Sequence, residues 1–212
     1  MNIKILYTAY FILALAALVG SWRFRQLPTN LRYLVGLVGL EVVTEIVSHT
    51  LRFYHKPNLL VNPVFAAGEL WLSALIYDKT LHYPRFSRVR PWLAGAFVVY
   101  CALDTILTPE VARFKPTLQL IESTLLLGMV ALYFRKLLHE LRVTRLEQEP
   151  MFWVSVGLVI NHLGKSQIYL FSNYLLTHYS TQLNLNIWDI HSLLLGVLYS
   201  CYLVALWIRP QN

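Results

Sequence analysis

Seven long apolar runs follow one another along this chain of 212 residues, and they restrict its fold more than any other feature. Each run is roughly 20 residues long, the length of α-helix that crosses a hydrocarbon layer of about 30 Å. Because lipid offers the backbone no hydrogen-bond partner, apolar spans of this length are expected to be helical. The sequence predicts an all-α, polytopic integral membrane protein, a single domain of seven transmembrane helices. The expected helices cover about residues 3–22, 32–53, 59–79, 91–109, 116–136, 151–176 and 187–208.

Proline positions support this division of the chain. Proline is tolerated in the first turn of a helix but disrupts its interior, so it is expected between spans or near their ends. The prolines at the expected boundaries or loops are Pro28, Pro57, Pro63, Pro84, Pro91, Pro109, Pro116, Pro150 and Pro210.

Composition agrees with a membrane protein. Hydrophobic residues make up 57% of the chain and charged residues 14%, and the mean hydropathy is +0.51. A soluble domain of this size could not bury so much apolar surface, so the lipid bilayer is the first expected partner. The two cysteines, Cys101 and Cys201, both lie in apolar runs, so neither a disulfide framework nor a cysteine-based zinc motif is indicated.

Lysine and arginine predict the orientation of the chain. Twelve basic residues lie after the first, third and fifth runs or at the C-terminus: Arg23, Arg25, Arg32, Lys79, Arg85, Arg88, Arg90, Arg135, Lys136, Arg142, Arg145 and Arg209. The opposite side carries five: Lys4, Arg52, Lys56, Arg113 and Lys115. The basic loops predict an outside N-terminus and a cytosolic C-terminus. They also explain the net charge of +7, so nucleic acid is not an expected partner.

The first run has an alternative interpretation. "MNIKILYTAYFILALAALVGS" combines a lysine, an apolar stretch and an Ala-x-Ala, as a signal peptide does. Cleavage would leave six spans and invert the charge bias of every later loop. We therefore expect the first helix to be retained.

The second run carries an unexpected polar stripe. In "EVVTEIVSHTLR", residues 41–52, the polar side chains fall at offsets 0, +3, +4, +7, +8 and +11. This spacing places them on one face of a helix. In the sixth run, His162, Lys165, Ser166 and Tyr169 follow the same rule.

These polar residues also coincide in depth. At about 1.5 Å rise per residue, Glu41, Glu45, Glu69, His162 and Lys165 lie near the membrane midplane. Asp104 and Glu122 lie slightly toward the outer side, and His49 and His191 lie farther out. A lone charge in hydrocarbon costs at least about 2.5–3.5 kcal/mol, so these side chains are expected to face the bundle interior. The predicted cavity for a ligand or ion, open toward the outside, comprises Glu41, Glu45, His49, Glu69, Asp104, Glu122, His162, Lys165 and His191.

Structural roles are the alternative for several members of this set. Glu69 and Glu122 could be neutral acids that bond neighbouring helices, and His162 could be a hydrogen-bonded core histidine. Lys165 is expected to pair with a carboxylate, Glu45 or Glu69.

Three functions remain open from the residues. A ligand sensor fits the outward-leaning cavity; without an output domain it would act through a separate partner at the cytosolic loops, above all residues 135–149. A small-solute or proton-coupled transporter is the alternative. A metal-dependent hydrolase would need His49, His162 and His191 with Glu45, Glu69 or Asp104 around zinc. Catalytic residues, cofactors and oligomeric state are not indicated, and an enzyme is not the first expectation.

Four segments of the chain resemble known sequences: "MFWVSVGLVIN", "LFSNYLL", "NIWDIHSLLLGVLY" and "NPVFAAGELWLSALIY". Together they resemble a group of short bacterial seven-helix membrane proteins of unassigned function. That group is loosely similar to the membrane sensor portions of bacterial signalling proteins. The resemblance implies a multi-pass protein of the bacterial inner membrane and transfers no functional residue.

Overall fold

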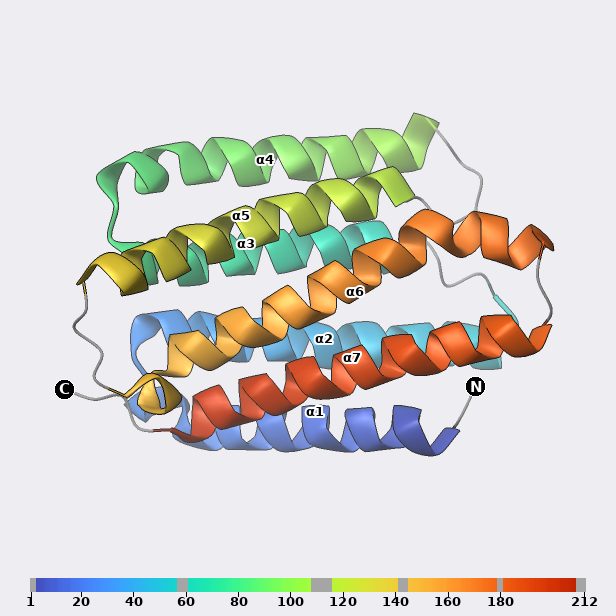
Figure 1. Cartoon of the computed structure of the whole chain (residues 1–212), viewed down its shortest axis with the longest axis horizontal. Coiled ribbons are helices and arrows are strands. Elements are labelled where there is room, and N and C mark those ends of the chain that lie inside the picture. The colour runs from blue at the N-terminus through green and yellow to red at the C-terminus, as the bar shows by residue number, and fades with distance from the viewer. Residues whose placement is uncertain (1–2, 57–60, 108–115, 141–144, 179–180, 209–212) are drawn as a thin grey trace.

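The computed structural model describes residues 3–56, 61–107, 116–140, 145–178 and 181–208, with side chains given outside 171–184 (Figure 1). Within these ranges every regular element is helical, which confirms the all-helical prediction. The α-helices are α1 (Ile3–Arg23), α2 (Thr29–Phe53), α3 (Val61–Leu81), α4 (Pro84–Leu107), α5 (Pro116–Glu140), α6 (Pro150–His178) and α7 (Thr181–Trp207). Two short 3-10 helices, η1 (Phe24–Gln26) and η2 (Leu146–Gln148), precede α2 and α6.

Six of these α-helices form a closed ring. α7 packs against α1 and α6, α2 packs against α1 and α3, and α5 packs against α3 and α6. α4 packs mainly on the outside of α3 and buries only Ala94, Phe97 and Cys101. Side chains of α2, α3, α5, α6 and α7 therefore share one interior, and α4 lies at its margin (Figure 1).

α6 and α7 approach each other closely because of a glycine. A Cβ placed on Gly157 would lie 2.8 Å from the Cβ of Cys201, closer than carbon atoms can pack. Small residues allow such close helix contacts inside a membrane, where dispersion forces rather than water drive association.

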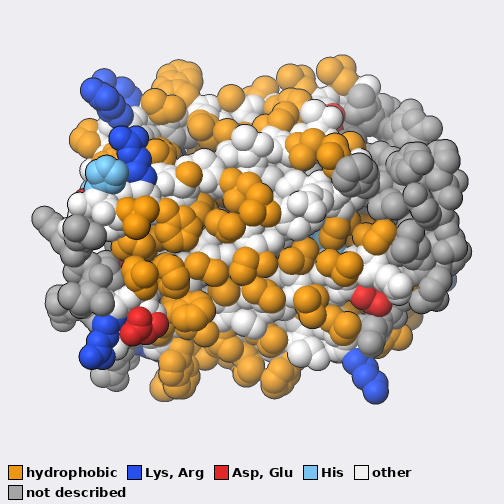
Figure 2. Space-filling view, viewed as in Figure 1, with side chains coloured by type: hydrophobic (Ala, Val, Ile, Leu, Met, Phe, Trp, Pro, Cys, Tyr) orange, Lys and Arg blue, Asp and Glu red, His pale blue; other side chains and the backbone are white. Residues whose placement is uncertain are grey.

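Five helices in the described ranges are long and apolar enough to cross a membrane: α1 with η1, α2, α4, α5 and the part of α7 from Leu185. Hydrophobic side chains cover the middle of the bundle, and Lys and Arg gather mainly at one end, with one further basic side chain at the lower right (Figure 2). Both features suggest a multi-pass membrane protein in contact with a lipid bilayer. The α-helices outside this set of five are α3, which carries Glu69, and α6, which carries His162 and Lys165.

α4 differs from the expected segment. It starts at Pro84 rather than Pro91, so Pro91 lies inside the helix and not at its boundary. Hydropathy reports only the apolar part of a helix, and the first two turns of α4 are basic and polar. Asp78, at the end of α3, holds these turns: it accepts hydrogen bonds from Ser87 Oγ at 2.6 Å and from Arg90 at 3.0 Å.

Cations cap two helices at the basic end of the bundle. The Arg23 guanidinium donates to the backbone carbonyl of Leu206 at 2.7 Å and to that of Trp207. Lys136 donates to the carbonyls of Thr80 and Leu81, each at 2.9 Å. The last carbonyls of a helix lack partners within the helix and attract positive charge. These bonds tie α1 to α7 and α5 to α3.

Candidate functional site

Buried polar side chains gather inside the ring. Glu41, Glu69, Glu122, His162 and Lys165 are all at most 8% exposed, and they come from four different helices. Native proteins bond or pair nearly all such groups, since an unpaired buried charge is costly. Their contacts therefore define what this interior can do.

Four of these residues touch one another, and we call Glu69, Glu122, His162 and Lys165 the buried ion cluster. The Lys165 Nζ lies 3.7 Å from Glu69 Oε2 and 3.6 Å from Glu122 Oε2. The His162 Nε2 lies 3.2 Å from Glu69 Oε1. α3, α5 and α6 are thus held together by one chain of ionisable groups.

His162 is fixed on both ring nitrogens. Its Nδ1 lies 3.2 Å from the hydroxyl of Ser123 on α5, opposite the contact of Nε2 with Glu69. An ionised carboxylate only accepts hydrogen bonds, so Nε2 carries the imidazole proton when Glu69 is ionised, and Ser123 donates to Nδ1. The interpretation of His162 as a hydrogen-bonded core histidine fits this geometry.

The cluster has more acceptors than donors. Among the described residues, the amide oxygen of Gln119 has no hydrogen-bond partner. The carboxyl groups of Glu69 and Glu122 contact each other, and each has one oxygen facing the Lys165 ammonium at 3.6–3.7 Å. Two carboxylates share one ammonium group, which leaves one negative charge unless a proton or a bound cation balances it. A site of this kind favours a species that brings positive charge or hydrogen-bond donors.

A cavity of about 100 Å³ adjoins the cluster. A single buried water needs about 10–15 Å³ on such a measure, so this space suits several waters or one small polar molecule. Its lining comes from α2, α3, α5, α6 and α7: Glu41, Thr44, Glu45, Ser48, Asn62, Phe65, Glu69, Gln119, Asn161, Lys165, Tyr169, His191 and Leu195.

The cavity occupies one half of the bundle only. In α2 its lining begins at Glu41, and in α3 it ends at Glu69. Toward the basic end the same helices bury Leu37 and Tyr77 with no exposure, and α5 and α6 add Leu126 and Val154, which are also fully buried. Packed apolar side chains therefore separate the cavity from the basic end.

Glu41 and Glu45 lie one turn apart on α2 but have different partners. Glu41 is buried and accepts a hydrogen bond from the Tyr199 hydroxyl of α7 at 3.0 Å. Glu45 is partly buried and accepts one from the Tyr10 hydroxyl of α1 at 2.8 Å. Each carboxylate thereby connects α2 to a different neighbour in the ring.

The predicted site residues separate into three groups. Glu41, Glu45, Glu69, Lys165 and His191 line the cavity. Glu122 and His162 adjoin it through their contacts with Lys165 and Glu69, respectively. His49 and Asp104 do not belong to it: His49 is exposed and lines a groove between α1 and α2, and Asp104 lies on the peripheral α4.

The expected ion pair of Lys165 with Glu45 or Glu69 is confirmed, and the partner is Glu69. The second carboxylate near Lys165 belongs to Glu122 of α5, because α5 packs between α3 and α6 in the ring. Glu45 is turned toward α1 and bonded to Tyr10.

Sequence reasoning missed Gln119, Ser123 and Asn161. A signal existed for two of them, since Gln119 lies three residues before Glu122 and Asn161 four residues before Lys165, spacings that share a helix face. Ser123 follows Glu122 directly and could be linked to His162 only by the packing of α5 on α6.

The histidines proposed for a zinc site do not converge. In the described part of the chain, no group of three or more His, Cys, Asp or Glu side chains is arranged to hold a metal ion. His49 is exposed beside α1, His162 is bonded to Glu69, and His191 packs edge-on against Tyr169 with ring centroids 6.1 Å apart.

The fold and this site define a class of protein: a helical bundle with several candidate membrane spans and a polar cavity beside a buried ion cluster. Comparison of the chain with protein-family models, with curated proteins and with solved structures finds no match. The resemblance to short bacterial seven-helix proteins therefore stays a prediction.

Proposed function

We propose that this protein is a ligand-sensing module of the bacterial inner membrane that binds a small, positively charged polar molecule in its internal cavity. It would cross the membrane seven times, with the N-terminus outside and the C-terminus in the cytosol. Signal output would pass to a separate partner at the cytosolic loops, including the end of α5. The orientation rests on the basic loops and on the start of α1 and the end of α7 at opposite ends of the bundle (Figure 1).

The acceptor-rich lining of the cavity carries this proposal. Gln119 lines it with a buried amide oxygen that has no hydrogen-bond partner among the described residues. Glu69 lines it with a carboxylate whose Oε2 shares the Lys165 ammonium with Glu122. Glu41 and Glu45 add two more carboxylates, whereas Lys165 is already flanked by Glu69 and Glu122. An ammonium or amidinium group would supply the donors and the charge that this lining lacks.

The packed half of the bundle favours a sensor over a carrier. Five helices meet at the cavity, so a bound ligand could change their relative packing, as a population shift requires. Leu37, Tyr77 and Leu126 are fully buried between the cavity and the basic end. The described residues therefore leave no open channel from the cavity to that end. A proton-coupled transporter remains the second candidate, because a cluster with an unbalanced acidic charge is suited to exchange a proton.

Ligand binding by purified protein tests the proposal. Methylammonium and guanidinium, at millimolar concentration, are expected to raise the thermal unfolding midpoint, whereas acetate and glycerol are not. Glu41→Gln should weaken this response, and Glu147→Gln, an exposed change at η2, should leave it unchanged. A response to acetate alone, or an equal loss in both variants, would overturn the proposal.

Two further measurements separate the alternatives. Cysteine labelling at Asn2 and Gln211, after replacement of Cys101 and Cys201, should report opposite sides of the membrane. Reconstituted vesicles should bind radiolabelled guanidinium, which stays charged and does not cross lipid as a neutral base, without accumulating it under a proton gradient. Accumulation that is lost in Glu69→Gln would identify a transporter instead.

A further inference from the structure

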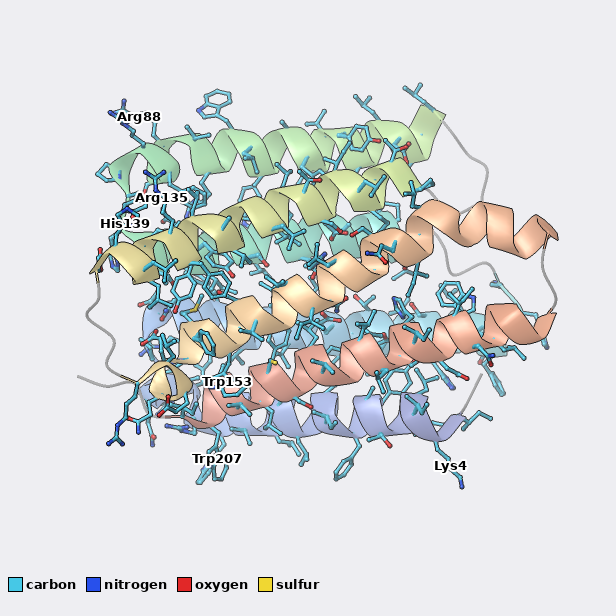
Figure 3. All side chains as sticks on the ribbon, viewed as in Figure 1. Lys4, Arg88, Arg135, His139, Trp153 and Trp207 are labelled. Carbon is cyan, nitrogen blue, oxygen red and sulfur yellow. The ribbon has the colours of Figure 1, made fainter. Side chains whose placement is uncertain are left out.

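A second concave surface lies at the basic end, far from the internal cavity, and we call it the α4–α5 groove. It has a volume of about 770 Å³ and is lined by the start of α4, with the preceding Tyr83, and by the end of α5. The lining residues that the argument uses are Arg85, Phe86, Val89, Leu132, Arg135 and His139. Figure 3 shows Arg135 and His139 at this end of the molecule, with Arg88 above them.

The α4–α5 groove is lined by positive charge. Its lining contains Arg85, Arg135 and His139 and no acidic residue. In the ranges that the structure describes, no ion pair involves Arg85 or Arg135. The neighbouring cations differ: Arg90 pairs with Asp78 at 3.0 Å, and Lys136 caps α3. Charge complementarity therefore points to an anionic occupant.

Both walls of the groove change from basic to apolar in the same direction. On α5, His139 and Arg135 lie nearer the end of the helix, and Leu132 lies about one turn further in. At the start of α4, Tyr83, Pro84 and Arg85 line the outer end, and the apolar Phe86 and Val89 follow. An occupant must be anionic at its outer end and apolar at its inner end. A free phosphate ion would match only half of this surface.

We propose that the α4–α5 groove binds one anionic phospholipid, with its phosphate between Arg85 and Arg135 and an acyl chain along Val89 and Leu132. Guanidinium groups pair with phosphate through two parallel hydrogen bonds, and basic pockets between membrane helices suit anionic headgroups. The position at the basic end agrees with a cytosolic leaflet, which is rich in such lipids. This site is independent of the internal cavity and of its ligand.

Lipid retention by the full-length protein tests the site. The protein is reconstituted in nanodiscs of phosphatidylcholine with a minor fraction of phosphatidylglycerol, then released for native mass spectrometry. Wild type is expected to retain one phosphatidylglycerol preferentially. Arg85→Gln and Arg135→Gln should each reduce the preference roughly fivefold, and the double variant by roughly the product. The side chains of Arg85 and Arg135 are both exposed, so the single variants are expected to fold. If the double variant fails to fold, either single variant is sufficient to test the site.

Arg88→Gln is the matched control. It removes the same charge from the same end of α4, but Arg88 does not line the groove. It should retain the lipid as wild type does. An equal loss in Arg88→Gln would show a diffuse charge effect and overturn the site. Stabilisation by inorganic phosphate as large as that by phosphatidylglycerol would replace the lipid with a free anion. An unchanged double variant would also refute the proposal.

Discussion

Lys136 and Lys165 lie on helices that pack together, yet their ammonium groups are held in different ways. Lys136, at the basic end of α5, donates to two backbone carbonyls at the end of α3, and its side chain is 18% exposed. Lys165, in the middle of α6, lies between the carboxylates of Glu69 and Glu122. Its side chain is 10% exposed, and that of Glu122 is fully buried. The first lysine is bonded to backbone carbonyls and lies 3.9 Å from the exposed carboxylate of Glu140, near water. The second lies between two carboxylates that are buried inside the bundle.

The contrast extends to the two halves of the ring. Near the basic end the buried polar groups are neutral: Tyr77 and Ser155 bond each other at 2.9 Å, and the hydroxyls of Tyr133 and Tyr202 have no hydrogen-bond partner among the described residues. In the other half several buried groups are ionisable, and two carboxylates, Glu69 and Glu122, share the single ammonium group of Lys165. Neutral buried groups are sufficient to hold a helical bundle together. The buried ion cluster costs free energy in lipid, which is why we assign a function to it.

Removal of Lys165 should produce the largest effect. Lys165→Met leaves Glu69 and Glu122 without their shared cation, and breaking a buried pair in this way costs about 3–5 kcal/mol. Chemical unfolding in detergent micelles measures the loss. Adding Glu122→Gln should recover part of it, since the stranded charge is then gone. Strictly additive losses in the double variant would mean that the two side chains are not coupled.

Removal of Lys136 should cost less. Lys136→Met removes two hydrogen bonds to the carbonyls of Thr80 and Leu81, but water can reach this end and replace them in part. We expect about 1–2 kcal/mol in the same assay. The carbonyls left behind are neutral, and the carboxylate of Glu140 is exposed to water, so Glu140→Gln should not rescue the protein. If Lys136→Met lowered the free energy of unfolding as much as Lys165→Met does, the two lysines would not differ in how they stabilise the bundle.

The smallest effect is expected at the neutral pair. Tyr77→Phe removes one hydroxyl and leaves Ser155 unbonded, at a cost of about 1 kcal/mol. Tyr77→Phe with Ser155→Ala should be close to wild type, because both polar groups are then absent. If the double variant were less stable than Tyr77→Phe, the hydrogen bond between Tyr77 and Ser155 would itself stabilise the fold, and would not merely satisfy two buried polar groups.

Much of the site followed from helix periodicity alone. The offsets in residues 41–52 place Glu41, Thr44, Glu45 and Ser48 on one face, and all four line the cavity. His49 satisfies the same offsets but lies at the edge of the stripe, where α1 does not cover it. A stripe on a helical wheel is broader than a cavity wall, so periodicity could not separate these residues.

Depth was a weaker guide than helix order. Asp104 and Glu122 were expected at similar depth, but Glu122 joins the cluster and Asp104 does not. The reason is that α5 enters the ring between α3 and α6, whereas α4 packs outside α3. Lipid solvates any apolar helix face equally well, and hydropathy therefore contains no information about which helices become neighbours.

The sequence by itself determined that the chain is helical, apolar enough for a membrane, basic mainly at one set of loops and polar along particular helix faces. These properties belong to single residues and to the periodicity of one helix, and each can be read without a partner. The tertiary structure alone decided that Lys165 contacts Glu122 rather than Glu45, that Glu45 bonds Tyr10, and that Ser123 fixes His162. Such contacts depend on the rotation and order of packed helices, which arise from side-chain packing across the whole ring.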